Sequence, residues 1–239
     1  MSLVIGKTTQ AKSVQQKQNT ASPALPSDKR GSVGNTDATR GPGGLWWLMA
    51  LPSFLISVYA IFFFTGNSPG DPKIVKRILS TTSGIVHISG SLITLGVGPI
   101  QYLHGLRRDH PVIHRWVGRV YTVGNTIGGV AAFYVTFHSL ANTWGKVGFA
   151  ALALCWLWTM GQGMRAIWAN DAAGHRDWMT RNFSLSYAAV MLRWQLPMFI
   201  LMGVDTFLAL SITGYLSWIP NLIFAEYCIR RTARKSRTE

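Results

Sequence analysis

Charge is scarce in this chain of 239 residues. Charged residues make up 13% of it, roughly half the share found in soluble domains. Acids are scarcer still, with 9 Asp and Glu against 23 Lys and Arg, which gives a formal net charge of +14. Apolar residues make up 48% and are clustered in runs. The lack of charge excludes a typical water-soluble enzyme, and the clustered apolar runs exclude a wholly disordered chain.

Cysteine is nearly absent as well. Cys155 and Cys228 are the only two, and both lie in apolar runs. This usage argues against a disulfide framework and against a cysteine-based zinc site. No H-x-x-x-H or carboxylate–histidine grouping falls on one helix face, so metal-dependent hydrolysis is not expected.

What the chain does have is six apolar runs, each close to the roughly 20 residues that cross a bilayer as a helix. They lie near 45–64, 83–104, 116–137, 147–168, 183–203 and 207–228. The sequence therefore predicts an all-α integral membrane bundle of about six transmembrane helices over residues 44–229. Residues 1–43 are polar, without apolar periodicity, and predict a disordered tail. Residues 230–239 predict a basic cytosolic tail.

The basic residues are distributed unequally between the two ends of these runs. With six spans both termini share a side, and that side carries 18 Lys and Arg, whereas the other side carries only Lys73, Lys76, Arg77 and Lys146. The positive-inside rule then places both termini in the cytosol, or in the matrix of a mitochondrion. The basic face is expected to contact anionic lipid headgroups rather than nucleic acid.

Two charged residues fall inside the runs, where lipid makes them costly. Arg193 lies well into the fifth run, too deep for its side chain to reach the interface, so it is expected to face the bundle interior. Glu226 is the only acid within a run. Arg193 serves either a structural network or a ligand, and both alternatives stay open.

Two similar motifs precede the third and fifth runs. The first is His114-Arg115-Trp116-Val117-Gly118-Arg119-Val120-Tyr121, and the second is His175-Arg176-Asp177-Trp178-Met179-Thr180-Arg181. Each motif is expected at a helix start, where free backbone N–H groups and the helix dipole favour anions. Arg115, Arg119, Arg176 and Arg181 suit a phosphate or a carboxylate such as a haem propionate. The alternative is an interfacial anchor whose arginines face lipid phosphates.

These motifs resemble a widespread family of small polytopic membrane proteins that is filed as a domain of unknown function. The family pattern has an early-span His and Gln, then H-R-x-x-G-R-x-Y, then H-x-x-W-M-x-R, then an Arg in the next span. The corresponding residues here are His87, Gln101, the two motifs and Arg193. The resemblance covers about residues 80–200 and implies a membrane bundle of the kind that holds haem, more than it implies a function.

The leading functional hypothesis is a b-type haem protein that transfers electrons across a membrane to a redox partner. His114 and His175 would be the iron ligands if the third and fifth spans are neighbours, and His87 would belong to a second cofactor site at the opposite side. The spacing of the histidines departs from that of two-haem bundles. His114 and His138 are 24 residues apart on one span, about 36 Å if helical, which is too far for two haems within one hydrocarbon core.

Two other classes remain open. One is a non-redox membrane enzyme, such as a cyclase or isomerase, acting on a lipophilic terpenoid or prenylated substrate. Its proton source would be Asp177 or Glu226, with Arg193 in the same site. The other is a transporter or an assembly scaffold with a structural Arg/His network.

Overall fold

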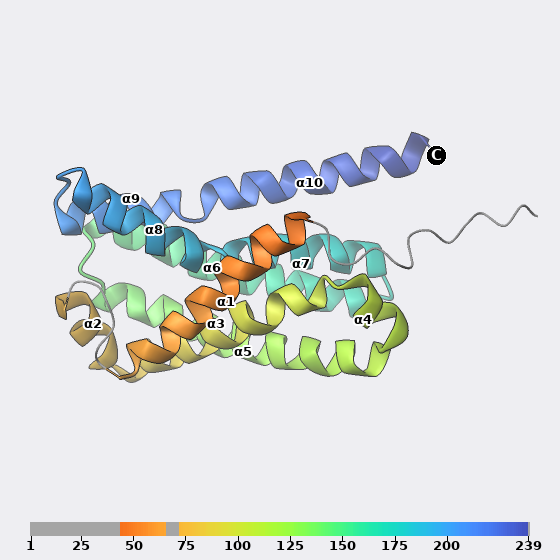
Figure 1. The fold of residues 1–239 in the computed structure, drawn as a ribbon, viewed down its shortest axis with the longest axis horizontal. Coiled ribbons are helices and arrows are strands. Elements are labelled where there is room, and N and C mark those ends of the chain that lie inside the picture. Colours follow the sequence, from red (N-terminus) through yellow and green to blue (C-terminus); the bar gives the residue numbers. More distant parts are fainter. Residues whose placement is uncertain (1–43, 66–71, 239) are drawn as a thin grey trace, which may run out of the picture. The chain divides into compact units, whose positions relative to one another are not determined.

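The computed structural model describes residues 44–65 and 72–238, and within these ranges the secondary structure is entirely helical. The helices are α1 (Gly44–Phe63), α2 (Pro72–Leu79), α3 (Thr82–Gln101), α4 (His104–Asp109), α5 (Pro111–His138), α6 (Thr143–Trp168), α7 (Ala172–Ser186), α8 (Ala188–Leu201), α9 (Thr206–Leu216) and α10 (Ile219–Thr238). They belong to one compact unit (Figure 1). The predicted disordered tail, 1–43, lies outside the described residues.

Hydrogen bonds between helices define two ends of this bundle. At the end that we call the His175 end, Trp46 of α1 donates to the carbonyl of Pro99 near the end of α3, at 2.9 Å. Gln101 donates to the carbonyl of His114 at the start of α5, at 3.2 Å. At the opposite end, the His87 end, Phe63 of α1 packs against Ile88 of α3. Successive long helices therefore run in opposite directions, as Figure 1 shows for α3 and α5.

Four segments of the described chain are long and apolar enough to cross a membrane. They are Trp46–Phe63, Thr82–Gln101, Thr143–Trp168 and Thr206–Arg234, the last of which comprises α9 and most of α10. The predicted third and fifth spans correspond to α5 and to α7 with α8, which are not among the four. The all-helical, multi-span architecture is thus confirmed, while six crossings stay a prediction.

The exposed face of α5 is apolar although the helix is not among those four segments. A stripe at helical spacing is exposed, consisting of Val120, Val123, Ile127, Val130, Tyr134 and Phe137. The opposite face carries buried Tyr121 and Asn125. A helix that turns its apolar stripe outward and its polar residues inward suits a lipid surrounding rather than water.

Glycines bring α3 and α5 together. A Cβ atom on Gly90 would lie 2.6 Å from the Cα of Gly128 and 2.6 Å from the carbonyl oxygen of Gly124. The sequence motif Gly124-x-x-x-Gly128 predicts a close helix contact, and the structure confirms it, with Gly90 as the partner. This approach places His87 of α3 beside the backbone of α5, where its Nδ1 lies 3.2 Å from the carbonyl oxygen of Gly128.

Three local features differ from the sequence prediction. Both motifs lie within their helices and not before them, because α5 begins at Pro111 and α7 at Ala172. The predicted fifth span is divided at Tyr187, whose N–H bonds back to the carbonyls of Leu185 and Phe183. The short helix α2 was not predicted, since its eight residues carry three cations and resemble a loop in composition.

Candidate functional site

His114 and His175 occupy equivalent positions, each being the fourth residue of its helix. α5 begins at Pro111, whose fixed φ and missing N–H suit the first helical position. α7 begins after Asp171, whose carboxylate accepts from the N–H of Gly174 at 2.8 Å. Both helices start at the His175 end, so the predicted placement of the two histidines at helix starts is confirmed.

The His175 ring is held by a backbone carbonyl. Its Nδ1 lies 2.8 Å from the carbonyl oxygen of Gly163 on α6. A carbonyl only accepts, so Nδ1 donates in this contact, and in the neutral form of the ring the lone pair is on Nε2. At Gly163 α6 also approaches α7 closely, since a Cβ atom there would lie 2.9 Å from Sδ of Met179. The arrangement, Nδ1–H to a carbonyl with Nε2 free, is typical of histidines that ligate metals.

His114 has a buried ring nitrogen without a partner. Its Nδ1 makes no hydrogen bond within the part of the chain that the structure describes. Burial lowers the pKa of His114, and the positive charges of Arg107, His175 and Arg115 lower that pKa further. His175 thus lies near enough to act electrostatically on His114. A neutral imidazole with an unassigned buried nitrogen is a feature that calls for a ligand.

The arginines of the two motifs have different surroundings. Arg181 is half-buried and forms an ion pair with Glu226 of α10, in which its Nη2 donates to Oε2 at 3.2 Å. Arg176 lies 3.6 Å from Asp177 at the surface. Arg119 stacks over Trp116 at 4.6 Å from the ring centroid. Arg115 is exposed beside His114.

The two candidate acids are therefore both next to arginine. Glu226 is engaged by Arg181, and Asp177 lies beside Arg176. The ion pair with Arg181 occupies the Glu226 carboxylate and opposes the use of Glu226 as a proton donor. Arg181 is likewise already paired, so it is less available to an external anion than the sequence motif suggests.

His87 and Arg193 belong to the opposite end. Gly128, the contact of His87 on α5, lies 14 residues beyond His114, or about 21 Å along the helix. Arg193 of α8 lies with its guanidinium carbon 5.7 Å from the ring centroid of Tyr59 on α1. Among the described residues, Arg193 makes no ion pair with a carboxylate. The structure thus places His114 and His175 at one end of the bundle and His87 and Arg193 toward the other.

Next to the His175 end lies a buried polar network that sequence reasoning missed. Asn182 is fully buried and accepts hydrogen bonds from the hydroxyl of Tyr121 at 2.7 Å and from the amide of Asn125 at 2.9 Å. It donates to the carbonyl of Trp156 at 2.8 Å and to the hydroxyl of Thr159 at 2.9 Å. The network joins α5, α6 and α7. Its signal in the sequence is Asn125 within the third apolar run, with Asn182 directly before the fifth.

The donor set at the His175 end limits what metal it can hold. No group of three or more His, Cys, Asp or Glu side chains suitable for a metal ion occurs within residues 44–65 and 72–238. His114 and His175 offer two imidazoles, which is the number that a bis-histidine haem iron takes from protein. Of these two, His114 has an unpartnered Nδ1 and His175 donates through its Nδ1 to a carbonyl.

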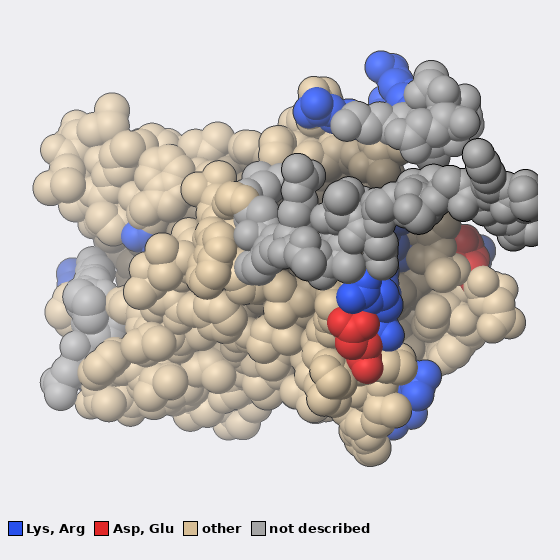
Figure 2. All heavy atoms as spheres, turned by 45° about the vertical axis from the view of Figure 1, so that its right-hand side comes forward, with Lys and Arg blue, Asp and Glu red and all other residues tan. Residues whose placement is uncertain are grey.

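The charged surface agrees with a membrane protein. Figure 2 shows Lys, Arg, Asp and Glu gathered mainly at the end that carries α4, beside a wide surface without charge.

Residues 84–229 match the family model described as predicted membrane protein (DUF2306). Comparison with curated proteins and with solved structures finds no match. The chain is an integral membrane protein with several spans.

Proposed function

This chain belongs to the DUF2306 family of membrane proteins, and on that premise we propose that it is a b-type haem protein that transfers electrons. The proposed site lies at the His175 end, with His114 of α5 and His175 of α7 as the axial ligands. A haem iron exchanges one electron at a time at a potential set by its ligands and their surroundings.

The buried, unpartnered Nδ1 of His114 carries this proposal. A buried polar atom without a hydrogen bond costs free energy, and native proteins retain such atoms where a ligand satisfies them. The lowered pKa keeps the His114 ring neutral near pH 7, which is the form that binds metal.

His175 supports the proposal through its tautomer. The bond from Nδ1–H to the carbonyl of Gly163 orients the ring and leaves Nε2 as the only nitrogen that can ligate. Because Gly163 belongs to α6, this orientation depends on the packing of α6 against α7 and not on the α7 sequence alone.

Exposed basic side chains supply the surroundings that propionates need. Arg107 and Arg115 both act electrostatically on His114, and both are exposed. Guanidinium groups bind carboxylates through charge-assisted hydrogen bonds. Arg176 lies one residue after His175 and has only a 3.6 Å contact with Asp177, so it is available for the same purpose.

Six crossings form part of the proposal. α5 and the pair α7 and α8 run between the same two ends as the four candidate spans, and α5 exposes an apolar stripe. We place the His175 end in the cytosol or the mitochondrial matrix, since it carries most of the basic residues. A redox partner would then meet the site from that side.

The test is a visible spectrum of the full-length protein, purified in mild detergent after expression with ample haem supply. We expect a Soret band and, after dithionite, a sharpened α-band, with b-type haem in a pyridine assay. His114→Ala and His175→Ala should each remove most of the bound haem. The matched controls are His104→Ala, an exposed histidine at the same end, and His138→Ala, whose Nδ1 also lies by a backbone carbonyl.

Two results would refute the proposal. One is a colourless protein that contains no haem. The other is a His114→Ala/His175→Ala double variant that retains the spectrum of the parent. A colourless, well-folded protein would favour the non-redox enzyme acting on a lipophilic substrate, with Arg193 as the first residue to replace.

A further inference from the structure

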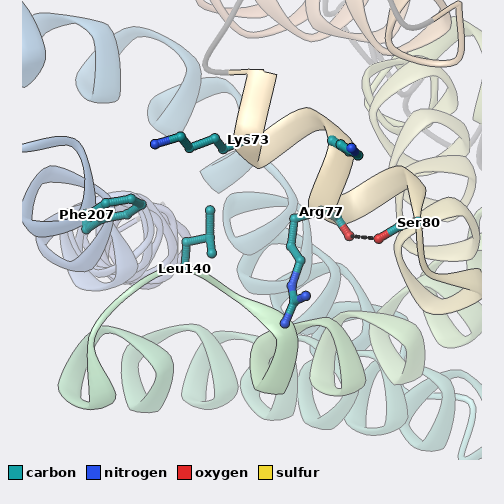
Figure 3. A pocket seen from close by; sticks show the side chains of 6 residues that line it. Lys73, Arg77, Ser80, Leu140 and Phe207 are labelled. Atoms are coloured by element: carbon teal, nitrogen blue, oxygen red, sulfur yellow. Dashed lines mark hydrogen bonds between the residues drawn. The ribbon is translucent and has the colours of Figure 1, made fainter.

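A pocket of about 340 Å³ lies at the His87 end, far from the proposed haem ligands. Its lining comes from α2 and the residue after it on one side, and from the α5–α6 connection and α9 on the other (Figure 3). The lining residues are Lys73, Lys76, Arg77, Ser80, Leu140 and Phe207. Cavities of this size are at the lower limit of small-molecule sites.

The fold keeps the three cations at the pocket. Val75 is buried and anchors α2 against Phe63 of α1 and Ile88 of α3. With this residue turned inward, the basic residues at 73, 76 and 77 remain on the outer side of the helix. Arg77 is further oriented by its Nε, which donates to the carbonyl of His138 at 3.1 Å. The basic cluster is thus held by packing and by a hydrogen bond.

Asp205, two residues before Phe207 of the pocket wall, makes no ion pair with Lys76 or Arg77 among the described residues, and Asp71, which directly precedes α2, lies outside those residues. Asp205 precedes α9, and its carboxylate accepts from the N–H groups of Phe207 and Leu208 at 3.0 Å each. It is therefore engaged as the N-cap of α9.

We propose that this pocket binds the phosphate of an amphipathic anion, with Lys76 and Arg77 as the groups that bind the phosphate and with the attached carbons against Leu140 and Phe207. Lysine and arginine bind phosphate through charge-assisted hydrogen bonds. The two apolar lining residues are suited to an organic group attached to the phosphate rather than to a bare ion. The proposal is independent of the haem site.

The phosphate has two conceivable sources. One is the headgroup of an anionic lipid, which suits a short basic helix beside the end of the apolar spans. The other is a soluble phosphate ester. Both present the same group to Lys76 and Arg77, so the experiment has to distinguish them.

The probe is dioctanoyl phosphatidic acid, titrated into the full-length protein in a neutral mild detergent, with binding followed by thermophoresis. We expect saturable binding that weakens by about a hundredfold or more in Lys76→Gln/Arg77→Gln, since two charge-assisted hydrogen bonds to the phosphate are lost. Lys76→Gln alone should weaken it less. Lys146→Gln is the matched control, because it removes one cation near the start of α6, at the same end, outside the pocket lining.

Two further probes separate the sources. Dioctanoylglycerol, which lacks the phosphate, should not compete. Glycerol 3-phosphate competing as strongly as phosphatidic acid supports the site with a soluble ester as its ligand, whereas weak competition supports it with a lipid. The proposal is overturned if Lys146→Gln weakens binding as much as the double variant, if dioctanoylglycerol competes fully, or if no saturable binding occurs.

Discussion

The buried network around Asn182 allows a quantitative prediction for Asn182→Ala. The side chain is fully buried and takes part in four hydrogen bonds, with Tyr121, Asn125, Trp156 and Thr159. Its removal leaves the helices formed but takes away four of the hydrogen bonds that join α5, α6 and α7. We therefore expect a loss of stability rather than of secondary structure.

The magnitude follows from what each partner retains. Tyr121 keeps its contact with Ser186 at 3.2 Å, and Thr159 keeps its bond to the carbonyl of Cys155 at 2.9 Å. The amide of Asn125 loses its partner, and its Oδ1 is already unpaired. One newly unpaired group costs about 1–3 kcal/mol, and four bonds at the membrane average of about 0.6 kcal/mol each give a similar figure. We expect Asn182→Ala to lower the free energy of unfolding by roughly 2–3 kcal/mol.

The assay is reversible unfolding in mixed micelles with increasing SDS, followed by tryptophan fluorescence. Asn221→Ala is the matched control, because Asn221 is half-buried and donates only to the carbonyls of Ser184 and Ser217. It should cost less than about 1 kcal/mol. The double variant Asn125→Ala/Asn182→Ala should cost less than the sum of the single variants, since removing both partners leaves no unpaired amide.

Additive effects in this cycle would refute the reasoning, because they would mean that Asn125 and Asn182 do not interact. A cost for Asn182→Ala no larger than that of Asn221→Ala would refute it as well. In either case the network would not hold the three helices together.

Three further predictions concern packing, charge and pH. Gly90→Ala should lower the melting temperature strongly, because the added Cβ would lie 2.6 Å from backbone atoms of α5. Gly161→Ala should be neutral or stabilising, because no atom lies within 4 Å of its added Cβ. Thermal unfolding of both variants in detergent is the measurement. Glu226→Gln should destabilise by about 1–3 kcal/mol, because it removes the negative charge that faces half-buried Arg181. Asp177→Asn should cost less than about 1 kcal/mol in the same SDS titration, because its arginine is exposed. Equal costs would contradict this order. The pKa of His114 is lower in the folded state than its ordinary value of 6.5, so the unfolded state binds more protons and stability falls as the pH drops through 6.5 toward the folded pKa. The parent should therefore lose more melting temperature between pH 7.5 and 5.5 than His114→Gln does, and equal losses would contradict the assignment.

The sequence predicted the class of protein and the positions of most helices because lipid imposes a strong constraint on composition. Runs of about 20 apolar residues have few structural alternatives to a membrane helix. The Gly124-x-x-x-Gly128 motif likewise predicted a close contact that the structure confirms. The boundaries of the helices were less predictable than the class of protein. α7 begins at Ala172 within a polar segment, and the interruption at Tyr187 follows from local hydrogen bonding without a proline or glycine at that residue.

The candidate site could be predicted only in part. The sequence singled out His114 and His175 from their similar motifs, but not the carbonyl of Gly163, which fixes the His175 tautomer from another helix. It treated the four motif arginines alike, whereas the structure pairs Arg181 with Glu226 across 45 residues. Pairings over such separations depend on which helices pack against one another. The periodicity of apolar residues within a single helix does not indicate which helices those are.

The sequence by itself determined that this protein lies in a membrane and that it is helical. Both properties depend on local composition and on hydrogen bonds within one segment. The tertiary structure alone decided which polar groups meet. Asn182 is satisfied by residues from two other helices, Arg193 lies over Tyr59, and three cations of α2 come to line one pocket with Phe207. Each of these contacts joins residues far apart in the chain, and only the packing of helices against one another brings them within bonding distance.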